Sequence, residues 1–199
     1  MKLLIGSHNP AKVDEYKKYL ADLDLELVSL ADLKINQEAP EDGQTFEENA
    51  IKKARFYRDL TGLSVITDDS GLTIDALNGE PGVKSRRWLG HRMNDEEMIQ
   101  AVMEKMKNVP EEKRDCHLVA VIALVAANGQ IHTQQAQIDG LVASKPLPQR
   151  IAGYPPRSFF YLPQLKKFYL ELTDQEHEQM NHRRLGLIKM KPILEKLCH

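Results

Sequence analysis

Cysteine and long apolar stretches are both scarce in this chain of 199 residues. Its two cysteines, Cys116 and Cys198, are too few by themselves to form a disulfide framework or a four-ligand zinc site. The longest nearly continuous apolar run, residues 118–127, is too short to span a bilayer, and the run within residues 1–6 is too short for a signal peptide. We therefore expect a soluble, cytoplasmic protein with no membrane partner.

An excess of charge of one sign is also missing. The 27 Lys and Arg residues nearly balance the 29 Asp and Glu residues, and the formal net charge is −2. Such a balance creates no overall field that would attract a nucleic acid, so we expect no nucleic-acid partner and only local basic sites. The length suits a single domain with a substantial core, which we expect to occupy residues 1–199.

The first half of the sequence alternates between strand and helix patterns. Asn9-Pro10 supplies an N-cap and a first helical residue, and Thr45 with Glu48 forms a capping box for a second helix that Gly62 can end. Three short apolar segments around these helices are strand candidates, at residues 2–5, 25–28 and 64–67.

The second half favours longer strands. Residues 118–127 are nearly all apolar, Asn128-Gly129 is a strong hairpin signal, and alternation follows from residue 131. Residues 146–163 are rich in Pro, Tyr and Phe and are predicted to form a long irregular loop. The C-terminus is predicted to be helical, with an interruption at Pro192. The predicted fold is α/β with a mixed, long-stranded sheet, as one domain or as two lobes around a cleft.

Two adjacent carboxylates stand out at Asp68-Asp69-Ser70-Gly71, directly after residues 64–67, where we expect a strand to end. Ligands of open α/β sheets bind beyond the carboxyl ends of strands, and paired Asp side chains offer the hard oxygen ligands that Mg²⁺ prefers. The same four residues also suit an ordinary turn, which is the favoured interpretation of the segment by itself.

Three other places add charges that such a site would need. Ser7-His8-Asn9-Pro10-Ala11-Lys12 lies between a strand and a helix N-terminus, where backbone N–H groups, the helix dipole and Lys12 favour a phosphate. Glu41-Asp42-Gly43 precedes the helix that carries Lys53, and Asn181-His182-Arg183 lies at an expected break between helices. Taken singly, each also fits a capped turn, a polar loop with a surface lysine, or charge complementation at a helix end.

Together these segments resemble the inosine triphosphatase-like family of noncanonical purine nucleoside triphosphate pyrophosphatases. The resemblance covers nearly the whole chain and rests on residues 7–12, Thr45-Phe46-Glu47-Glu48-Asn49-Ala50, Asp68-Asp69-Ser70-Gly71-Leu72, Pro81-Gly82-Val83-Lys84-Ser85-Arg86 and His182-Arg183. It implies an elongated mixed α/β fold with two lobes around a central cleft, a homodimer, and Mg²⁺-dependent cleavage of a nucleoside triphosphate such as ITP, dITP or XTP to monophosphate and pyrophosphate.

The resemblance also implies roles for single residues. Glu41 and Asp69 are the expected Mg²⁺ ligands, and Asp69 is the expected catalytic base, with Asp68 as the alternative. Adjacent carboxylates cannot both ionise freely without a cation between them, which fits one of them acting as base. The residues expected to bind phosphate or other parts of the substrate are Ser7, His8, Asn9, Lys12, Lys53, Ser70, His182 and Arg183.

The sequence departs from the family pattern where the base should be read. Ala152-Gly153-Tyr154-Pro155-Pro156 replaces the usual Phe-Gly-Tyr-Asp-Pro, so a stacking aromatic and a hydrogen-bonding Asp are both missing, and the following Arg157-Ser158 lengthens the loop. His177 stands where the family has a lysine, and Asn181 where it has a serine. The candidate base-pocket residues are therefore Tyr154, Pro155, Phe159 and His177.

These departures predict relaxed or redirected base recognition, because a pocket without its buried hydrogen-bonding group discriminates less. Phe159, Phe160 or Tyr161 is an alternative stacking partner. A different alignment of the loop would instead give the recognition role to another residue. Two other functions stay open: a nucleotide-binding module without catalysis, and a pyrophosphatase for a modified pyrimidine or damaged nucleotide. The complete set of carboxylates and lysines argues against the first, and the changed loop is the only support for the second.

Overall fold

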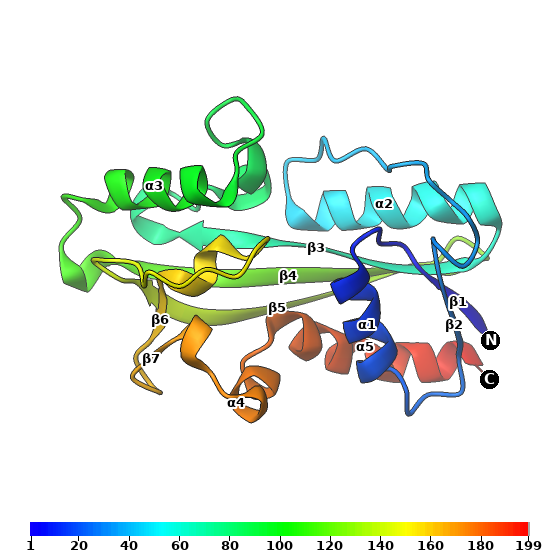
Figure 1. Ribbon diagram of the computed structural model, residues 1–199. Coiled ribbons are helices and arrows are strands. Elements are labelled where there is room, and N and C mark those ends of the chain that lie inside the picture. The colour runs from blue at the N-terminus through cyan, green and yellow to red at the C-terminus, as the bar shows by residue number, and fades with distance from the viewer. Residues whose placement is uncertain (199) are drawn as a thin grey trace. The chain divides into compact units, whose positions relative to one another are not determined.

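The computed structural model describes residues 1–198 and has the predicted α/β fold (Figure 1). Over these residues one mixed sheet has the strand order β2-β1-β3-β4-β5-β6-β7. Strand β1 pairs in parallel with β2 and β3, whereas β6 pairs antiparallel with β5 and β7. The strands are β1 (Lys2–Ile5), β2 (Glu26–Ser29), β3 (Ser64–Ile74), β4 (Asp115–Val125), β5 (Ile131–Val142), β6 (Phe160–Leu162) and β7 (Lys167–Phe168).

The helices begin where the capping signals predict. Asn9 caps α1 and Thr45 caps α2, each through its side-chain oxygen, and Gly62 ends α2 in the left-handed conformation with φ 70°. No helix within residues 1–198 is long and apolar enough to cross a membrane. The α-helices are α1 (Pro10–Tyr19), α2 (Phe46–Thr61), α3 (Asp95–Met106), α4 (Asp174–Gln179) and α5 (His182–Cys198).

The chain divides into two compact units. The first contains Met1–Ser70, Ala120–Ala136 and the segment from His182 to the C-terminus, and the second contains Gly71–Val119 and Gln137–Asn181. The residues that the sequence assigns to phosphate and metal belong to the first unit. The base-pocket candidates belong to the second unit, so the two sets are described separately.

The first unit buries both faces of its part of the sheet. Strand residues alternate between the two faces, so Leu3 and Ile66 pack on one side with residues of α1 and α5, while Leu4 and Val65 pack on the other with residues of α2. Figure 1 shows α2 on one side of the sheet and α1 and α5 on the other. The alternation continues along β3, which places Asp68 on the face of α1 and α5 and Asp69 on the face of α2.

The prediction that a strand ends before the two aspartates is wrong. Strand β3 continues through Asp68, Asp69 and Gly71 as far as Ile74. The local turn preference of these residues is overridden because each carboxylate finds partners on the helices that cover its own face, and no turn is needed to solvate it. The carboxylates therefore project from the body of a strand.

The predicted interruption of the C-terminal helix at Pro192 is also wrong, because α5 includes Pro192. Leu187 and Met190 before the proline and Leu194 after it are fully buried in the same apolar cluster. Packing on both sides of Pro192 thus holds the helix together despite the hydrogen bond that proline cannot make.

The expectation of an irregular loop over residues 146–163 holds only in part, because the loop ends in β6. Phe160 of this strand is fully buried. A Cβ atom added to Gly140 of β5 would lie 2.4 Å from Cε1 of Phe160, so the ring occupies the space that a larger residue would need. This close packing fixes the segment that follows the predicted base loop.

His117 of β4 contacts two carboxylates in the second unit. Its Nδ1 lies 2.7 Å from Oδ1 of Asp139, and its Nε2 lies 3.1 Å from Oδ1 of Asp75. Burial by itself would lower the pKa of His117, but the hydrogen bonds to Asp139 and Asp75 outweigh this effect and raise it. The protonated ring donates to both carboxylates, so it ties β4 to β5 and to the segment after β3.

This contact predicts a pH-dependent contribution to stability. Because the folded-state pKa of His117 lies above the unfolded value near 6.5, the stabilisation is complete below that value and is lost as the pH rises through the folded-state pKa. The difference in free energy of unfolding between the native protein and His117→Gln should therefore be larger at about pH 5.5 than at about pH 8.5. Urea unfolding at the two pH values measures it, and an equal difference at both would contradict the expected role.

Candidate active site

The loop before α1 is built around Asn9. The side-chain Oδ1 of Asn9 accepts a hydrogen bond of 3.0 Å from the backbone N–H of Ala11, and the backbone N–H of Asn9 donates to Oγ of Ser7 at 3.2 Å. The ring of His8 is exposed, and its Nε2 lies 3.0 Å from the backbone oxygen of Gln37. This loop thus presents Ser7, His8 and Asn9 at the positive end of the α1 dipole, as the sequence predicts.

Asp68 is the centre of a buried charge cluster. Its side chain is 1% exposed, and Oδ2 accepts from Nζ of Lys12 at 2.9 Å and from Nε of Arg183 at 3.2 Å. The hydroxyl of Tyr16 donates to Oδ1 at 3.3 Å. Burial would raise the pKa of Asp68, but the positive charges of Arg183 and Lys12 outweigh it and hold this pKa well below its usual range. Asp68 is therefore an ionised anchor for two cations.

Arg183 completes this cluster from the first turn of α5, next to His182. Its Nη1 pairs with the carboxylate of Glu15 on α1, and its Nη2 lies 3.5 Å from Oγ of Ser70. The carboxylates of Asp68 and Glu15 raise the pKa of Arg183 although burial opposes this. The guanidinium is thus held by two carboxylates, with one edge directed toward Ser70.

Asp69 belongs to a second cluster on the other face of β3. Nζ of Lys53 lies 3.2 Å from Oδ1 of Asp69 and 2.9 Å from Oε1 of Glu41. The side chain of Asp69 is 15% exposed, and burial raises its pKa against the pull of Lys53. Burial also acts to lower the pKa of Lys53, but Asp69 and Glu41 reverse this and raise it. Lys53 therefore holds both expected metal ligands at once.

Asn49 adds a neutral group to this second cluster. Its Nδ2 donates to Oδ2 of Asp69 at 3.0 Å, and its Oδ1 accepts from the backbone N–H of Gly43 at 2.7 Å. Asn49 is 2% exposed and lies one helical turn before Lys53 on α2. The loop containing Glu41 and Gly43 is thereby attached to Asp69 at two points.

Asp68 and Asp69 do not accept from the same lysine, because neighbouring strand residues face opposite ways. Each carboxylate has its own lysine, Lys12 for Asp68 and Lys53 for Asp69. The pKa of Asp68 is lowered and that of Asp69 is raised. The pKa values of the two carboxylates shift in opposite directions because burial is outweighed by the charges of Arg183 and Lys12 at Asp68, whereas burial is the largest cause at Asp69.

Residues 1–198 contain no group of three or more His, Cys, Asp or Glu side chains placed to hold a metal ion. Glu41 and Asp69 nevertheless meet at one ammonium group, which marks a place where a cation is already favoured. Mg²⁺ typically takes one or two carboxylates and completes its shell with water and substrate phosphates. The pair Glu41 and Asp69 fits that donor set.

Comparison with known proteins identifies the family. The model of the Ham1 family matches residues 3–193. The chain belongs to the Ham1 family. A dITP/XTP pyrophosphatase of Yersinia pseudotuberculosis is 40% identical over 195 residues, covering 97% of this chain and 98% of that protein. One of Thermoanaerobacter pseudethanolicus is 36% identical over 196 residues, covering 98% of each. The structure of a HAM1 protein from Coxiella burnetii has a TM-score of 0.88 at 33% identity, covering 98% of this chain and 99% of that one.

The base-pocket candidates of this Ham1 family member lie in the second unit. Tyr154 is half-buried, and the guanidinium of Arg157 lies 4.4 Å from its ring centre. Pro155 is buried at the start of a short 3₁₀ helix, and His177 of α4 packs edge-on against Tyr169 with ring centres 5.2 Å apart. Tyr154 is thus a partly exposed aromatic residue of the segment 152–158.

Phe159 does not fit the stacking role that the sequence offered for it. Its side chain is fully buried, as is that of Phe160, so neither ring exposes a face on which a purine could lie. Tyr161 is half-buried and packs against Phe168 with ring centres 5.5 Å apart. The two phenylalanines are core residues of β6 and the segment before it.

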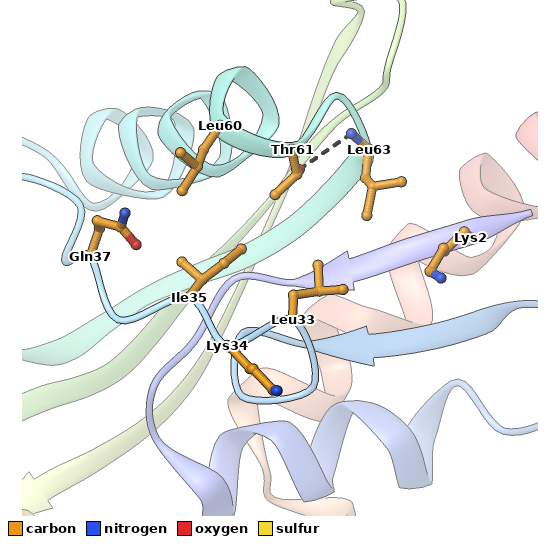
Figure 2. A pocket seen from close by; sticks show the side chains of 8 residues that line it. All are labelled: Lys2, Leu33, Lys34, Ile35, Gln37, Leu60, Thr61 and Leu63. Atoms are coloured by element: carbon orange, nitrogen blue, oxygen red, sulfur yellow. Dashed lines mark hydrogen bonds between the residues drawn. The ribbon is translucent and has the colours of Figure 1, made fainter.

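A cavity of about 490 Å³ lies elsewhere in the first unit (Figure 2). Leu33, Ile35, Leu60 and Leu63 give it an apolar wall, and Lys2 and Lys34 stand at its border. None of the site residues predicted from the sequence lines it. The candidate phosphate and metal residues thus gather around β3 and not at this cavity.

Three contacts of the site were not foreseen from the sequence. Tyr16 is a fully buried residue of α1, and its hydroxyl also donates to Asp68. Glu15 precedes it and pairs with Arg183 from far along the chain. The position of Asn49 could be predicted from the sequence spacing, because it lies four residues before Lys53 and so on the same face of α2.

Proposed function

We propose that this chain is a Mg²⁺-dependent pyrophosphatase that hydrolyses noncanonical purine nucleoside triphosphates such as dITP, ITP and XTP to monophosphate and pyrophosphate. Membership of the Ham1 family supports the reaction, since relatives of 36 to 40% identity are dITP/XTP pyrophosphatases. The observation that carries the proposal is the pair of charge clusters on β3, one around Asp68 and one around Asp69. We further propose that the chain acts as a single enzyme domain and forms a homodimer.

The first cluster has the properties of a polyphosphate site. Lys12 and Arg183 bring two positive charges to the α1 N-terminus, where Ser7 and Asn9 add neutral donors. Burial lowers the pKa of Lys12, but the charge of Asp68 opposes this. A triphosphate carries several negative charges, and cations with backbone N–H groups at a helix N-terminus neutralise and orient them. His8, Ser70 and His182 are proposed to contribute further contacts to the substrate.

The second cluster would hold the metal. Glu41 and Asp69 are the proposed Mg²⁺ ligands, and Lys53 is proposed to move its charge to a phosphate oxygen when substrate arrives. Bound Mg²⁺ supplies a Lewis acid and a template that aligns the phosphates. Asn49 and Lys53 each donate a hydrogen bond to Asp69, and Lys53 also donates to Glu41.

Asp69 is the better candidate for the base. Its partial exposure and raised pKa suit a carboxylate that accepts a proton from water, whereas Asp68 is buried under three donors and kept ionised by Arg183 and Lys12. In the proposed step the water oxygen attacks the α-phosphorus, its proton passes to Asp69, and pyrophosphate leaves.

Base recognition is proposed to be relaxed relative to the family. Pro155 has no side-chain acceptor for the edge of a purine, and its side chain is buried. Tyr154 is the proposed contact of the base, with Pro155 and His177 shaping the pocket. A pocket that lacks a buried hydrogen-bonding partner excludes alternative bases less strongly.

The proposal is tested by measuring pyrophosphate release from dITP, ITP, XTP, the common nucleoside triphosphates and several modified ones, with Mg²⁺ and with EDTA. We expect Mg²⁺-dependent release that ranks dITP, ITP and XTP first but by a modest margin, about tenfold, over dGTP and dATP. A much larger margin would contradict relaxed recognition and leave the reaction intact. If a modified pyrimidine nucleotide gave the highest turnover, the substrate class would be modified pyrimidines and not noncanonical purines. No turnover of any compound would refute the proposed function.

A further inference from the structure

The side-chain amide of Asn49 uses both of its ends. The oxygen accepts from the N–H of Gly43, and the nitrogen donates to Asp69, at 2.7 and 3.0 Å. A backbone N–H can only donate and an ionised carboxylate can only accept, so the partners themselves fix which end of the amide faces each of them. With 2% of its surface exposed, Asn49 has no room to exchange these partners for water.

Asn49 and Lys53 each link Asp69 of β3 to the loop that contains Glu41 and Gly43. Both come from one face of α2, and each donates to a different oxygen of Asp69. On the other side Asn49 holds Gly43, and Lys53 holds Glu41, two residues earlier in the same loop. One link is neutral and the other is charged.

The two links respond differently to a bound triphosphate. The ammonium of Lys53 is attracted by phosphate charge, and any movement toward it weakens its bonds to Glu41 and Asp69. The amide of Asn49 carries no net charge, so no comparable force acts on it. The neutral link therefore persists when the charged link is drawn away.

We infer that Asn49 is a positioning residue that fixes the loop carrying Glu41 against Asp69, and so sets the geometry of the two carboxylates that bind the metal. The inference rests on the proposed function. Asn49 itself contacts neither metal nor substrate in this assignment. Groups that orient metal ligands typically change metal affinity or activity by about 10- to 100-fold when they are removed.

The first test is Asn49→Ala. We expect the Mg²⁺ concentration for half-maximal activity to rise about 10- to 100-fold, with little change in the substrate KM at saturating Mg²⁺. Binding of Mn²⁺, followed by electron paramagnetic resonance in the presence of the α,β-methylene analogue of dITP, should weaken by a similar factor. This second measurement does not depend on turnover.

A second variant reaches the same contact from the other side. A Cβ atom on Gly43 would lie 2.6 Å from Oδ1 of Asn49 and 2.9 Å from Cβ of Glu48, so Gly43→Ala must push the loop away from α2. It should weaken Mn²⁺ binding in the same direction while every side chain of the site is kept. The two substitutions should be less than additive when combined, because they disturb one contact.

Asn128→Ala is the matched control, since Asn128 is an exposed turn residue of the same unit whose side chain accepts from the N–H of Gln130. It should leave Mn²⁺ binding unchanged. If Asn49→Ala does not fold, as judged by thermal unfolding, Gly43→Ala decides the question. Native Mn²⁺ affinity in the folded variants, with an active native protein, would overturn the role of Asn49 alone. An inactive native protein would instead refute the proposed function.

Discussion

Replacing Asp69 by Asn is expected to lower kcat by about 10³-fold or more while the protein stays folded. General base catalysis contributes about 10²- to 10⁴-fold by itself, and the same substitution weakens a metal ligand. Asn keeps the shape of the side chain, and its amide oxygen can still accept from Asn49 or Lys53. Steady-state release of pyrophosphate from dITP at saturating Mg²⁺ measures the effect.

Asp42→Asn provides the control for this prediction. Asp42 lies next to Glu41 on the same loop, but its side chain is 74% exposed and pairs with Lys52. The control should keep native kcat. If Asp69→Asn kept more than about a tenth of the native kcat, Asp69 would not be the base, and Asp68 would become the candidate.

Replacing Asp68 by Ala is expected to destabilise the protein by about 3–5 kcal/mol, because it leaves the cations of Lys12 and Arg183 in a buried cluster without their shared carboxylate. The hydroxyl of Tyr16 also loses its acceptor. Since the folded-state pKa of Asp68 lies below its unfolded value, this contribution is present at neutral pH and disappears as the pH falls toward the folded-state pKa. Urea unfolding at neutral pH measures the loss.

The surface ion pair between Asp22 and Lys191 provides the control for Asp68→Ala. Asp22 is 65% exposed, and water and salt screen its charge, so Asp22→Ala should leave the free energy of unfolding nearly unchanged. An equally small effect of Asp68→Ala would mean that Lys12 and Arg183 find water or other acceptors when Asp68 is gone. The assignment of Asp68 as a structural anchor would then be wrong.

Local signals in the sequence predicted the helix ends well. Asn9, Thr45 and Gly62 act through hydrogen bonds or backbone angles within a few residues, so their effect does not depend on the rest of the fold. The first strand, Lys2–Ile5, was also found with its observed bounds, since its apolar run is short and buried.

The errors arose where distant contacts decide the local structure. The chain around Asp68 and Asp69 has the composition of a turn, and only partners from α1, α2 and α5 allow it to remain extended. Pro192 would end an isolated helix, yet core packing on both sides of it carries α5 onward. No single-sequence pattern encodes such partners.

In the site, too, the sequence predicted the residues but not the contacts that depend on distant parts of the chain. The resemblance to the inosine triphosphatase-like family identified Lys12, Lys53 and Arg183 as substrate-binding candidates. The carboxylate with which each of them pairs follows from the two faces of β3. The side chain of Asn49 could be placed on the face of Lys53 by counting along the helix, whereas its bond to Gly43 depends on how the preceding loop folds back.

The alternation of Asp68 and Asp69 also makes this strand unusually intolerant of length changes. Deleting one residue between Ile66 and Asp68 would rotate the following carboxylates to opposite faces, giving Asp69 the surroundings of Lys12 and leaving a different side chain beside Lys53. Loss of the Thr67 codon would thus place Asp69 at the anchor position and put Ser70 at the position of the proposed base. Insertions and deletions among homologous chains should therefore avoid this stretch even where substitutions are accepted.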